Sequence, residues 1–174
     1  RDLEAMADGG EAPPRDLGFA ALVEALEGKR VVHHHTHRAD DIVTVLRLSE
    51  EFGFRLVLHH VSEAIMVAEE IAEADVPCSV IMIDSPGGKQ EAINLSFETG
   101  RVLDENGVKV AYHTDDYITD SRYFFRSAAL GIRAGLARDT ALASLSLHGA
   151  EMMDLGDQIG SLVPGKDADF VILS

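Results

Sequence analysis

The sequence predicts an α/β fold in which about four consecutive β/α units build a parallel sheet. Helix-like stretches, with apolar residues three and four positions apart, alternate along the chain with short apolar runs. These runs are apolar along their whole length, as expected for parallel strands that are covered on both faces. The chain has 174 residues, which suits one domain but is short for a complete eight-unit β/α barrel of about 250 residues.

The predicted elements follow one another from residue 16 onward. Strands are expected at 30–35, 55–59, 78–83, 108–112 and 169–173. Helices are expected at 16–28, 39–52, 63–74, 97–106, 121–135 and 139–154. Ser62 and Ser96 are suited to cap helix starts, and Gly53 is suited to end the helix before it. Residues 1–14 are polar and contain glycine and proline, so they are predicted to form an arm or loop.

Composition excludes several classes of partner. Thirty acidic against 15 basic residues give a net charge of −15, which repels phosphate backbones and argues against nucleic-acid binding. The single cysteine, Cys78, cannot form an internal disulfide and adjoins an apolar run, so we expect a core residue in a reducing compartment. No apolar stretch approaches the roughly 20 residues of a membrane-spanning helix. We therefore expect a cytoplasmic protein without a membrane partner.

Histidines and carboxylates gather at the ends of three predicted strands. Seven of the eight histidines lie there, namely His33, His34, His35 and His37 after the first strand, His59 and His60 after the second, and His113 just before Asp115 and Asp116. Alternate residues of a strand share a face, so His34 should point away from the others and only one or two of the first group should serve one site. Imidazole and carboxylate are ligands for zinc and related ions. Because the carboxyl ends of parallel strands lie at one rim, a metal site is predicted there.

Four motifs resemble those of the amidohydrolase superfamily, in particular imidazolonepropionase-like and prolidase-like enzymes. Residues 35–42, His-Thr-His-Arg-Ala-Asp-Asp-Ile, resemble the family's fifth-strand motif, and residues 58–64 resemble the sixth-strand motif. Residues 113–115, His-Thr-Asp, resemble the eighth-strand motif. Residues 159–171 resemble the stretch that leads out of the barrel into a small β-sandwich, and this match is the most specific of the four. The order and spacing of the four motifs also agree with the family.

The resemblance implies a fold and a domain division. It covers about residues 16–174 and implies a partial (β/α)8 TIM-type barrel, built from strands 5–8 of the family and spanning residues 15–158. Residues 159–174 would then form the C-terminal strand of the small β-sandwich, the rest of which is missing from this chain. The chain therefore resembles only the C-terminal half of such an enzyme.

The resemblance also implies roles for individual residues. His35 and His60 would be metal ligands, with zinc the expected ion, and Asp115 would bind metal and shuttle a proton. Asp115 would take a proton from the attacking water and deliver it to the leaving nitrogen of an amide or cyclic amide substrate. His113 would orient Asp115 or polarise the substrate, with a supporting hydrogen-bond role as the equal alternative.

Two departures from the family limit this expectation. Val61 stands where the family often has glycine, which bears on the turn after the sixth strand. The family's first-strand His-x-His pair and fourth-strand Lys or Glu have no counterpart before His33. We therefore expect either a fragment of a longer product or a partner that supplies the rest, weak or partial metal occupancy, and little activity of the chain alone. The alternatives are a non-catalytic metal-binding protein and an inert fragment that assembles through open edges.

Two further expectations concern surfaces. Four β/α units leave edge strands near Val31 and Val110, so association into a homodimer or higher oligomer is predicted. Asp84 and Lys89 follow the third predicted strand, where substrate contacts often fall, although solvated loop charges are the preferred interpretation.

Overall fold

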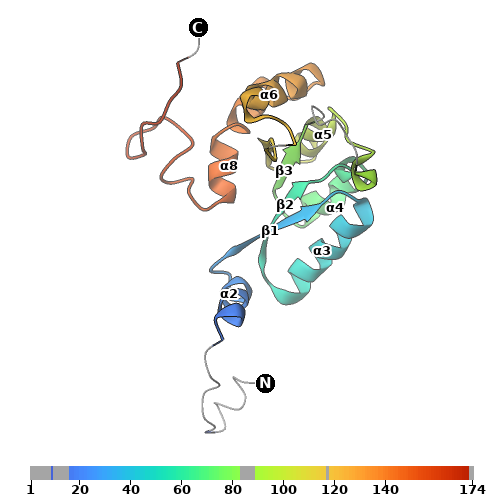
Figure 1. The fold of residues 1–174 in the computed structure, drawn as a ribbon, viewed down its shortest axis with the longest axis vertical. Coiled ribbons are helices and arrows are strands. Elements are labelled where there is room, and N and C mark those ends of the chain that lie inside the picture. Colours follow the sequence, from blue (N-terminus) through green and yellow to red (C-terminus); the bar gives the residue numbers. More distant parts are fainter. Residues whose placement is uncertain (1–8, 10–15, 83–88, 117, 173–174) are drawn as a thin grey trace.

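The protein is an α/β domain with a four-stranded parallel sheet, seen in a computed structural model (Figure 1). The structure describes residues 9, 16–82, 89–116 and 118–172. The strands lie side by side in chain order and are β1 (Val31–Thr36), β2 (Arg55–His60), β3 (Cys78–Ile81) and β4 (Val110–His113). All four coincide with predicted strands. The arrangement matches the predicted partial TIM-type barrel.

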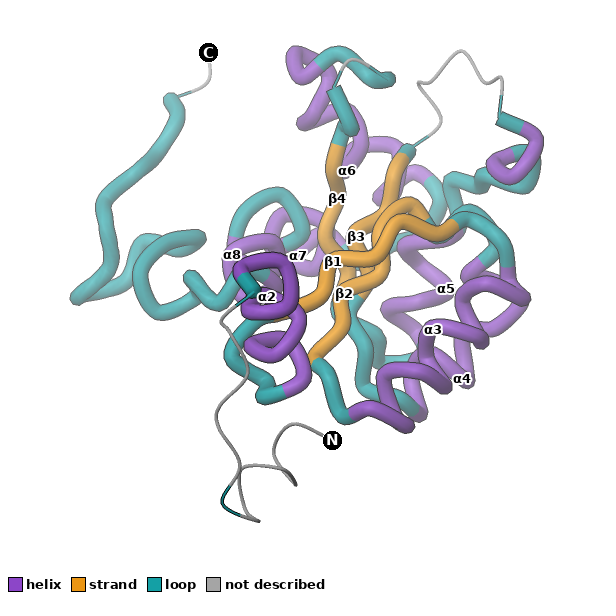
Figure 2. Tube along the Cα trace, turned by 60° about the horizontal axis from the view of Figure 1, so that its bottom comes forward, coloured by secondary structure: helices purple, strands orange, loops and turns teal. Residues whose placement is uncertain are grey.

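Helices follow each strand, as predicted, and lie mainly on one face of the sheet. The α-helices are α2 (Leu17–Leu26), α3 (Ala39–Phe52), α4 (Ala68–Glu73), α5 (Thr99–Glu105), α6 (Phe124–Arg133), α7 (Arg138–Ala143) and α8 (Leu147–Met152). Three short 3-10 helices are η1 (Ala64–Val67), η2 (Gln90–Ala92) and η3 (Ser121–Tyr123). Figure 2 shows α3, α4 and α5 together on one side of the strands, with α8 on the other. Three predicted helices are divided, because 63–74 begins as η1, 121–135 begins as η3, and 139–154 breaks between α7 and α8.

The main core lies between the sheet and its helices. Leu58, Val80 and Val110 point from the strands into it and are almost completely buried. Helix α3 contributes Ile42 and ends at Gly53, whose left-handed φ of 70° and N–H bond to the Ser49 carbonyl confirm the predicted cap. A second, much smaller cluster on the opposite face contains Val57, Ala111 and Met152, with Val31 packed against it. The face that would line a barrel interior is therefore only thinly covered.

The Tyr112 side chain of β4 packs against helices α5 and α6. Its hydroxyl is buried and lacks a hydrogen-bond partner among the described residues. A Cβ added at Gly100 of α5 or at Gly131 of α6 would lie 2.3 Å from that hydroxyl oxygen. Only glycine leaves room for the tyrosine ring at both positions, so this slot fixes how α5 and α6 approach the sheet.

The two edges of the sheet differ. Two outward backbone groups of β4 have partners in the α7–α8 segment, because Tyr112 N–H donates to the Ser144 carbonyl at 3.0 Å and His148 Nδ1 lies 2.7 Å from the Val110 carbonyl. The prediction of an open edge near Val110 is therefore wrong, since the α7–α8 segment covers it. On β1, the outward groups of His33 and His35 have no backbone partner within the described part of the chain.

Several smaller expectations are corrected by the structure. Residues 169–172 form no strand, because no neighbouring strand among the described residues is available to pair with them. Ser62 caps no helix, since its hydroxyl is engaged by His37. Ser96 does accept a hydrogen bond from the Glu98 N–H at 3.2 Å, close to the start of α5. The predicted arm at 1–14 lies almost wholly outside the described residues, and Asp84 does as well.

Helix α2 is the most exposed helix. It begins at Asp16, whose carboxylate accepts N–H bonds from Gly18 and Phe19, but it has no buried residue. Its apolar side chains Leu17 and Phe19 are 76% and 66% exposed. Within the described residues, no helix is both long and apolar enough to cross a membrane.

Candidate metal centre

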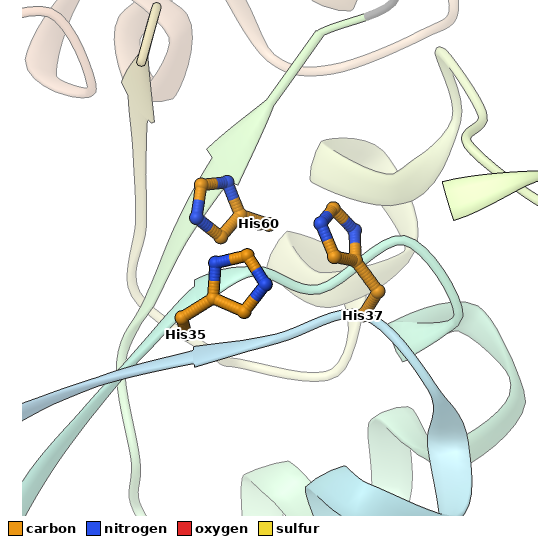
Figure 3. Close-up of side chains that lie close together, drawn as sticks. All are labelled: His35, His37 and His60. Carbon is orange, nitrogen blue, oxygen red and sulfur yellow. The ribbon is translucent and has the colours of Figure 1, made fainter. Parts of the chain in front are cut away.

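Three histidines converge at the carboxyl end of the sheet. Ring nitrogens of His35, His37 and His60 lie within 4.8 Å of one another, and the three rings face a common point (Figure 3). His35 comes from β1, His60 from β2, and His37 from the turn into α3. His37 and His60 are buried, whereas His35 is about half exposed. Such a set of imidazoles has the donor chemistry that zinc and related divalent ions require.

Strand alternation explains why His35 and His37 belong together. Both lie on the face predicted for odd-numbered residues of this run, with ring centroids 5.0 Å apart. The sequence identified this face, but His37 was not among the residues predicted to bind metal. His34 points to the other face, as expected, and its buried Nδ1 has no partner among the described residues.

An unusual backbone conformation brings His60 into the cluster. In β2, residue 60 is the register partner of Thr36, so regular alternation would place it on the face opposite His35. Instead His60 has φ 71° and the next residue, Val61, has φ 47°, both in the left-handed region. This reversal turns the imidazole toward His35, with ring centroids 4.4 Å apart. Such conformations cost about 1–3 kcal/mol each in non-glycine residues and often occur at functional sites.

Ser62 orients His37. The hydroxyl oxygen lies 2.5 Å from His37 Nδ1, and both residues are buried. The Glu63 N–H also donates to the His37 carbonyl at 2.9 Å, which fixes the backbone. Because Nδ1 is occupied, Nε2 is the nitrogen of His37 that remains for a ligand. A hydrogen bond at the second ring nitrogen is the usual way to fix the tautomer of a metal-binding histidine.

A second chain of contacts fixes His60. Its Nδ1 lies 3.1 Å from His113 Nε2, and His113 Nδ1 lies 2.8 Å from the Ser79 hydroxyl. If Nε2 of His60 binds an ion, its Nδ1–H donates to His113 Nε2, and His113 Nδ1–H then donates to Ser79. Burial, followed by the neighbouring histidines, lowers the pKa of His60 to about 3 and that of His113 to about 3. Both rings are therefore neutral near pH 7, which a metal ligand requires.

Asp115 lies nearby but outside the three-histidine cluster. It is exposed, has φ 50°, and lines a cavity of about 60 Å³ together with His37, His60 and Lys89. Among the described residues it forms no ion pair with the three clustered histidines. The structure thus places the predicted carboxylate at the predicted rim, adjacent to the histidines, without direct contact. His113 likewise contacts His60 and Ser79 and makes no hydrogen bond to Asp115.

A carboxylate that was not predicted lies closer. Glu91 Oε1 in η2 is 3.5 Å from His35 Nε2 and 4.0 Å from His37 Nε2. Lys89 Nζ lies 3.6 Å from the same oxygen. Residue 91 follows a glycine-containing loop with no periodic pattern, so the sequence carried no signal for this contact.

The remaining rim histidines form a separate pair. His33 Nδ1 lies 2.9 Å from His59 Nε2 on the thinly covered face of the sheet. Burial, and next the nearby His33, lowers the pKa of His59. Each histidine of this pair uses one ring nitrogen in the contact with the other, and the pair lies outside the three-histidine cluster.

Comparison with known proteins shows the family of this chain. Residues 16–174 match the model of the amidohydrolase family. This chain belongs to that family. It is 29% identical to Amidohydrolase tasK of Hapsidospora irregularis over 163 residues, which is 91% of this chain and 17% of that protein. Adenine deaminase 1 of Latilactobacillus sakei is 31% identical over 85 residues, covering 44% of this chain and 14% of that protein.

Solved structures confirm the fold. A crystal structure of an amidohydrolase from Thermotoga maritima superposes with a TM-score of 0.88 at 35% identity, covering 96% of this chain and 44% of that one. A prolidase complexed with N-methylphosphonate-L-proline has a TM-score of 0.61 at 19% identity, covering 86% of this chain and 40% of that one. The chain therefore spans less than half the length of these relatives, and its four-stranded sheet corresponds to part of the amidohydrolase barrel.

Proposed function

We propose that this chain is the metal-binding C-terminal part of an amidohydrolase that hydrolyses an amide or cyclic amide C–N bond. The observation that carries the proposal is the cluster of His35, His37 and His60 at the carboxyl end of the sheet. In α/β barrels this end carries the active site. Zinc is the proposed ion, and a related fold solved with bound zinc, an adenosine deaminase from Xanthomonas campestris, is compatible with this choice.

The residues divide into holding, orienting and proton-transfer roles. His35, His37 and His60 would hold the ion through their free ring nitrogens, while Ser62 and His113 keep two of those rings in place. Zinc, when bound, supplies the acidity that lets a water molecule lose its proton near neutral pH. Asp115, at the edge of the shared cavity, would accept that proton and return it to the leaving nitrogen.

A second candidate function is metal binding without catalysis. It is favoured by the position of Asp115, which is exposed and outside direct contact with the histidines. For the chain alone we propose that metal binding exceeds hydrolytic activity.

Calorimetric titration with zinc, followed by hydrolysis assays on a panel of amides and cyclic amides, tests this function. The wild-type chain should bind one ion, and His60→Asn should weaken binding at least tenfold. The matched control is His34→Gln, which alters a histidine on the opposite face and should leave binding unchanged. If hydrolysis is detected, Asp115→Asn should abolish it while zinc still binds. Metal binding with no hydrolysis of any substrate would favour the second candidate, and equal binding by His60→Asn and wild type would contradict both.

A further inference from the structure

We propose that Glu63 is a positioning residue of the metal centre, which holds the backbone of the His37 turn so that this imidazole faces the other two histidines of the cluster. This inference rests on the proposed function, since it concerns the same site. Ser62 already fixes the ring of His37. The backbone beneath that ring needs a separate restraint, because β1 and its pairing with β2 end at Thr36.

Two hydrogen bonds from Glu63 hold the turn at both ends. Its N–H donates to the His37 carbonyl at 2.9 Å, and its carboxylate oxygen Oε2 accepts the Ala39 N–H at 2.8 Å. Residues 37–39 are therefore held by a single residue of the segment that follows β2. Since His60 lies only three residues before Glu63, the same bonds help to set the position of His37 relative to His60.

The start of α3 depends on the same carboxylate. The N-cap residue, Arg38, makes no side-chain hydrogen bond to the helix, and its guanidinium bonds to Asp40 instead. The first N–H groups of a helix have no partner within the helix and usually receive one from the N-cap side chain. Glu63 supplies a partner from outside α3, and its negative charge suits the positive end of the helix dipole. Loss of this bond should loosen the first turn of α3 and the adjoining His37.

The second oxygen of Glu63 extends the restraint to the cavity beside the histidines. Oε1 accepts a hydrogen bond from Asn94 Nδ2 at 2.8 Å. Asn94 lies in the segment that contributes Ala92 and Leu95 to the wall of the cavity of about 60 Å³. One side chain therefore joins the histidine cluster to the wall that a substrate would contact.

Two variants separate the hydrogen bonds of Glu63 from its charge. Glu63→Gln removes the charge, but its amide oxygen has the same reach and still accepts the Ala39 N–H. Glu63→Asp keeps the charge but is one methylene shorter, so the bond to Ala39 is lost. Because residues that orient metal ligands contribute about 10–100-fold to metal affinity, Glu63→Asp should weaken zinc binding by about tenfold and Glu63→Gln by no more than about threefold. Zinc calorimetry on the whole chain measures both.

The bond can also be removed from the side of its donor. Ala39→Pro deletes the N–H at the first position of α3, where proline is well tolerated, and the extended backbone of Arg38 (φ −81°, ψ 144°) suits a residue before proline. This variant should weaken zinc binding about as much as Glu63→Asp, and combining the two should add no further loss. Asp40→Asn is the matched control, since it removes a charge from the same helix start without touching the Glu63 bonds.

Two further readouts distinguish positioning from general stability. The Ala39 amide should exchange faster in Glu63→Asp and at the wild-type rate in Glu63→Gln. The visible absorption of bound cobalt should likewise change in Glu63→Asp, because one imidazole is displaced, and return in Glu63→Gln. Circular dichroism confirms that each variant is folded, and Ala39→Pro provides the test if Glu63→Asp does not fold.

The outcomes separate this inference from the proposed function. Zinc affinities of Glu63→Asp and Ala39→Pro within about twofold of wild type would overturn the positioning role, while the metal site itself stands. Equal losses in Glu63→Gln and Glu63→Asp would also overturn it, since charge rather than hydrogen bonding would then matter. If His60→Asn binds zinc as tightly as wild type, the site and the proposed function fail together.

Discussion

The β4 side and the β1 side of the sheet are built differently, although both carry residues of the rim. On the β4 side the strand edge is covered by the α7–α8 segment, Tyr112 fills a slot between two glycines, and His113 is held by Ser79. On the β1 side the outward backbone of His33 and His35 has no partner among the described residues, and α2 leaves its apolar side chains exposed.

This difference divides the site into two halves. The half near β4, which contains His60 and His113, is held in place by hydrogen bonds, and the half near β1, which contains His35, is exposed to solvent. His60 is buried, its support His113 on β4 is partly buried, and a hydrogen bond joins the two neutral rings. His35, on β1, is about half exposed and lies at the edge where a further strand could pair. In a closed barrel no such edge exists. Among the described residues, the β1 side is therefore the open edge of the sheet.

The largest expected effect concerns the two neutral histidines of the half near β4. His60 and His113 have folded-state pKa values lowered to about 3, against about 6.5 in an unfolded chain. Their contribution to stability is therefore complete above pH 6.5 and is lost as the pH falls from 6.5 toward 3, because the unfolded state then binds the protons. Metal-free protein should lose roughly 3 kcal/mol of unfolding free energy between pH 7 and pH 5. Urea denaturation in the presence of a chelator measures this loss.

A variant serves as the control for this pH dependence. His113→Gln removes one of the two histidines whose pKa is lowered most and should clearly reduce the slope of stability against pH, while His34, His37 and His59, whose pKa values are also lowered, keep part of it. A stability that stays constant or rises between pH 7 and pH 5 would contradict the neutral state of His60 and His113 in the folded protein.

The slot around Tyr112 gives the next largest effect. Gly131→Ala places a methyl group 2.3 Å from the Tyr112 hydroxyl and should destabilise the protein by about 2 kcal/mol through overpacking. Gly149→Ala in α8 is the matched control, since nothing lies within 4 Å of the added Cβ. It should be neutral or stabilising by up to about 1 kcal/mol, because alanine favours helix. Thermal denaturation of both variants measures the difference. Equal changes in melting temperature would show that the space between the two glycines does not restrict the Tyr112 ring.

Removing the cover of the β4 edge should have a smaller effect. His148→Leu leaves the Val110 carbonyl without its partner and should cost about 1 kcal/mol. Hydrogen exchange should become faster at the neighbouring Tyr112 amide, which donates to Ser144. Unchanged exchange at Tyr112 would mean that the α7–α8 segment holds the edge without His148.

The open edge at β1 should lead to self-association of the chain, with little effect on the free energy of unfolding. We expect the amides of His33 and His35 to exchange quickly in dilute solution and more slowly at high concentration, as β1 pairs with a second copy. The Tyr112 amide should exchange slowly at every concentration. Light scattering after size exclusion provides the second readout. A single species at the 18.8 kDa chain mass over a wide concentration range would contradict this expectation.

Periodicity was sufficient to predict the strands and helices of a parallel α/β sheet, because burial in the main core repeats at short sequence intervals, whereas the partial barrel was implied by the family resemblance. The four strands and the end of α3 at Gly53 follow from such local patterns. The cover of the β4 edge could not be predicted in this way, since Tyr112 and Ser144 meet through backbone atoms that carry no sequence signal. The expected strand at 169–173 was wrong for a related reason. A strand depends on a neighbour, which the local sequence does not reveal.

The candidate site was predicted in part. His35 and His60 were placed at the correct rim because histidines at the ends of parallel strands meet there. His37 lay on the predicted face but was not selected as a ligand, and Glu91 came from a loop whose path has no periodic signature. Whether Asp115 transfers a proton remains a prediction.

The left-handed corner at His60 and Val61 makes the metal centre dependent on the folded state. Val61 is fully buried, and its N–H donates to the Thr36 carbonyl at 2.8 Å, so tertiary packing maintains a backbone that an isolated β-branched residue would avoid. When that packing is lost, the His60 backbone can relax and its imidazole leaves the other two. An unfolded chain would contain every histidine but no preformed site, so zinc binding and folding would be thermodynamically coupled. Added zinc should then raise the melting temperature in proportion to the logarithm of its free concentration.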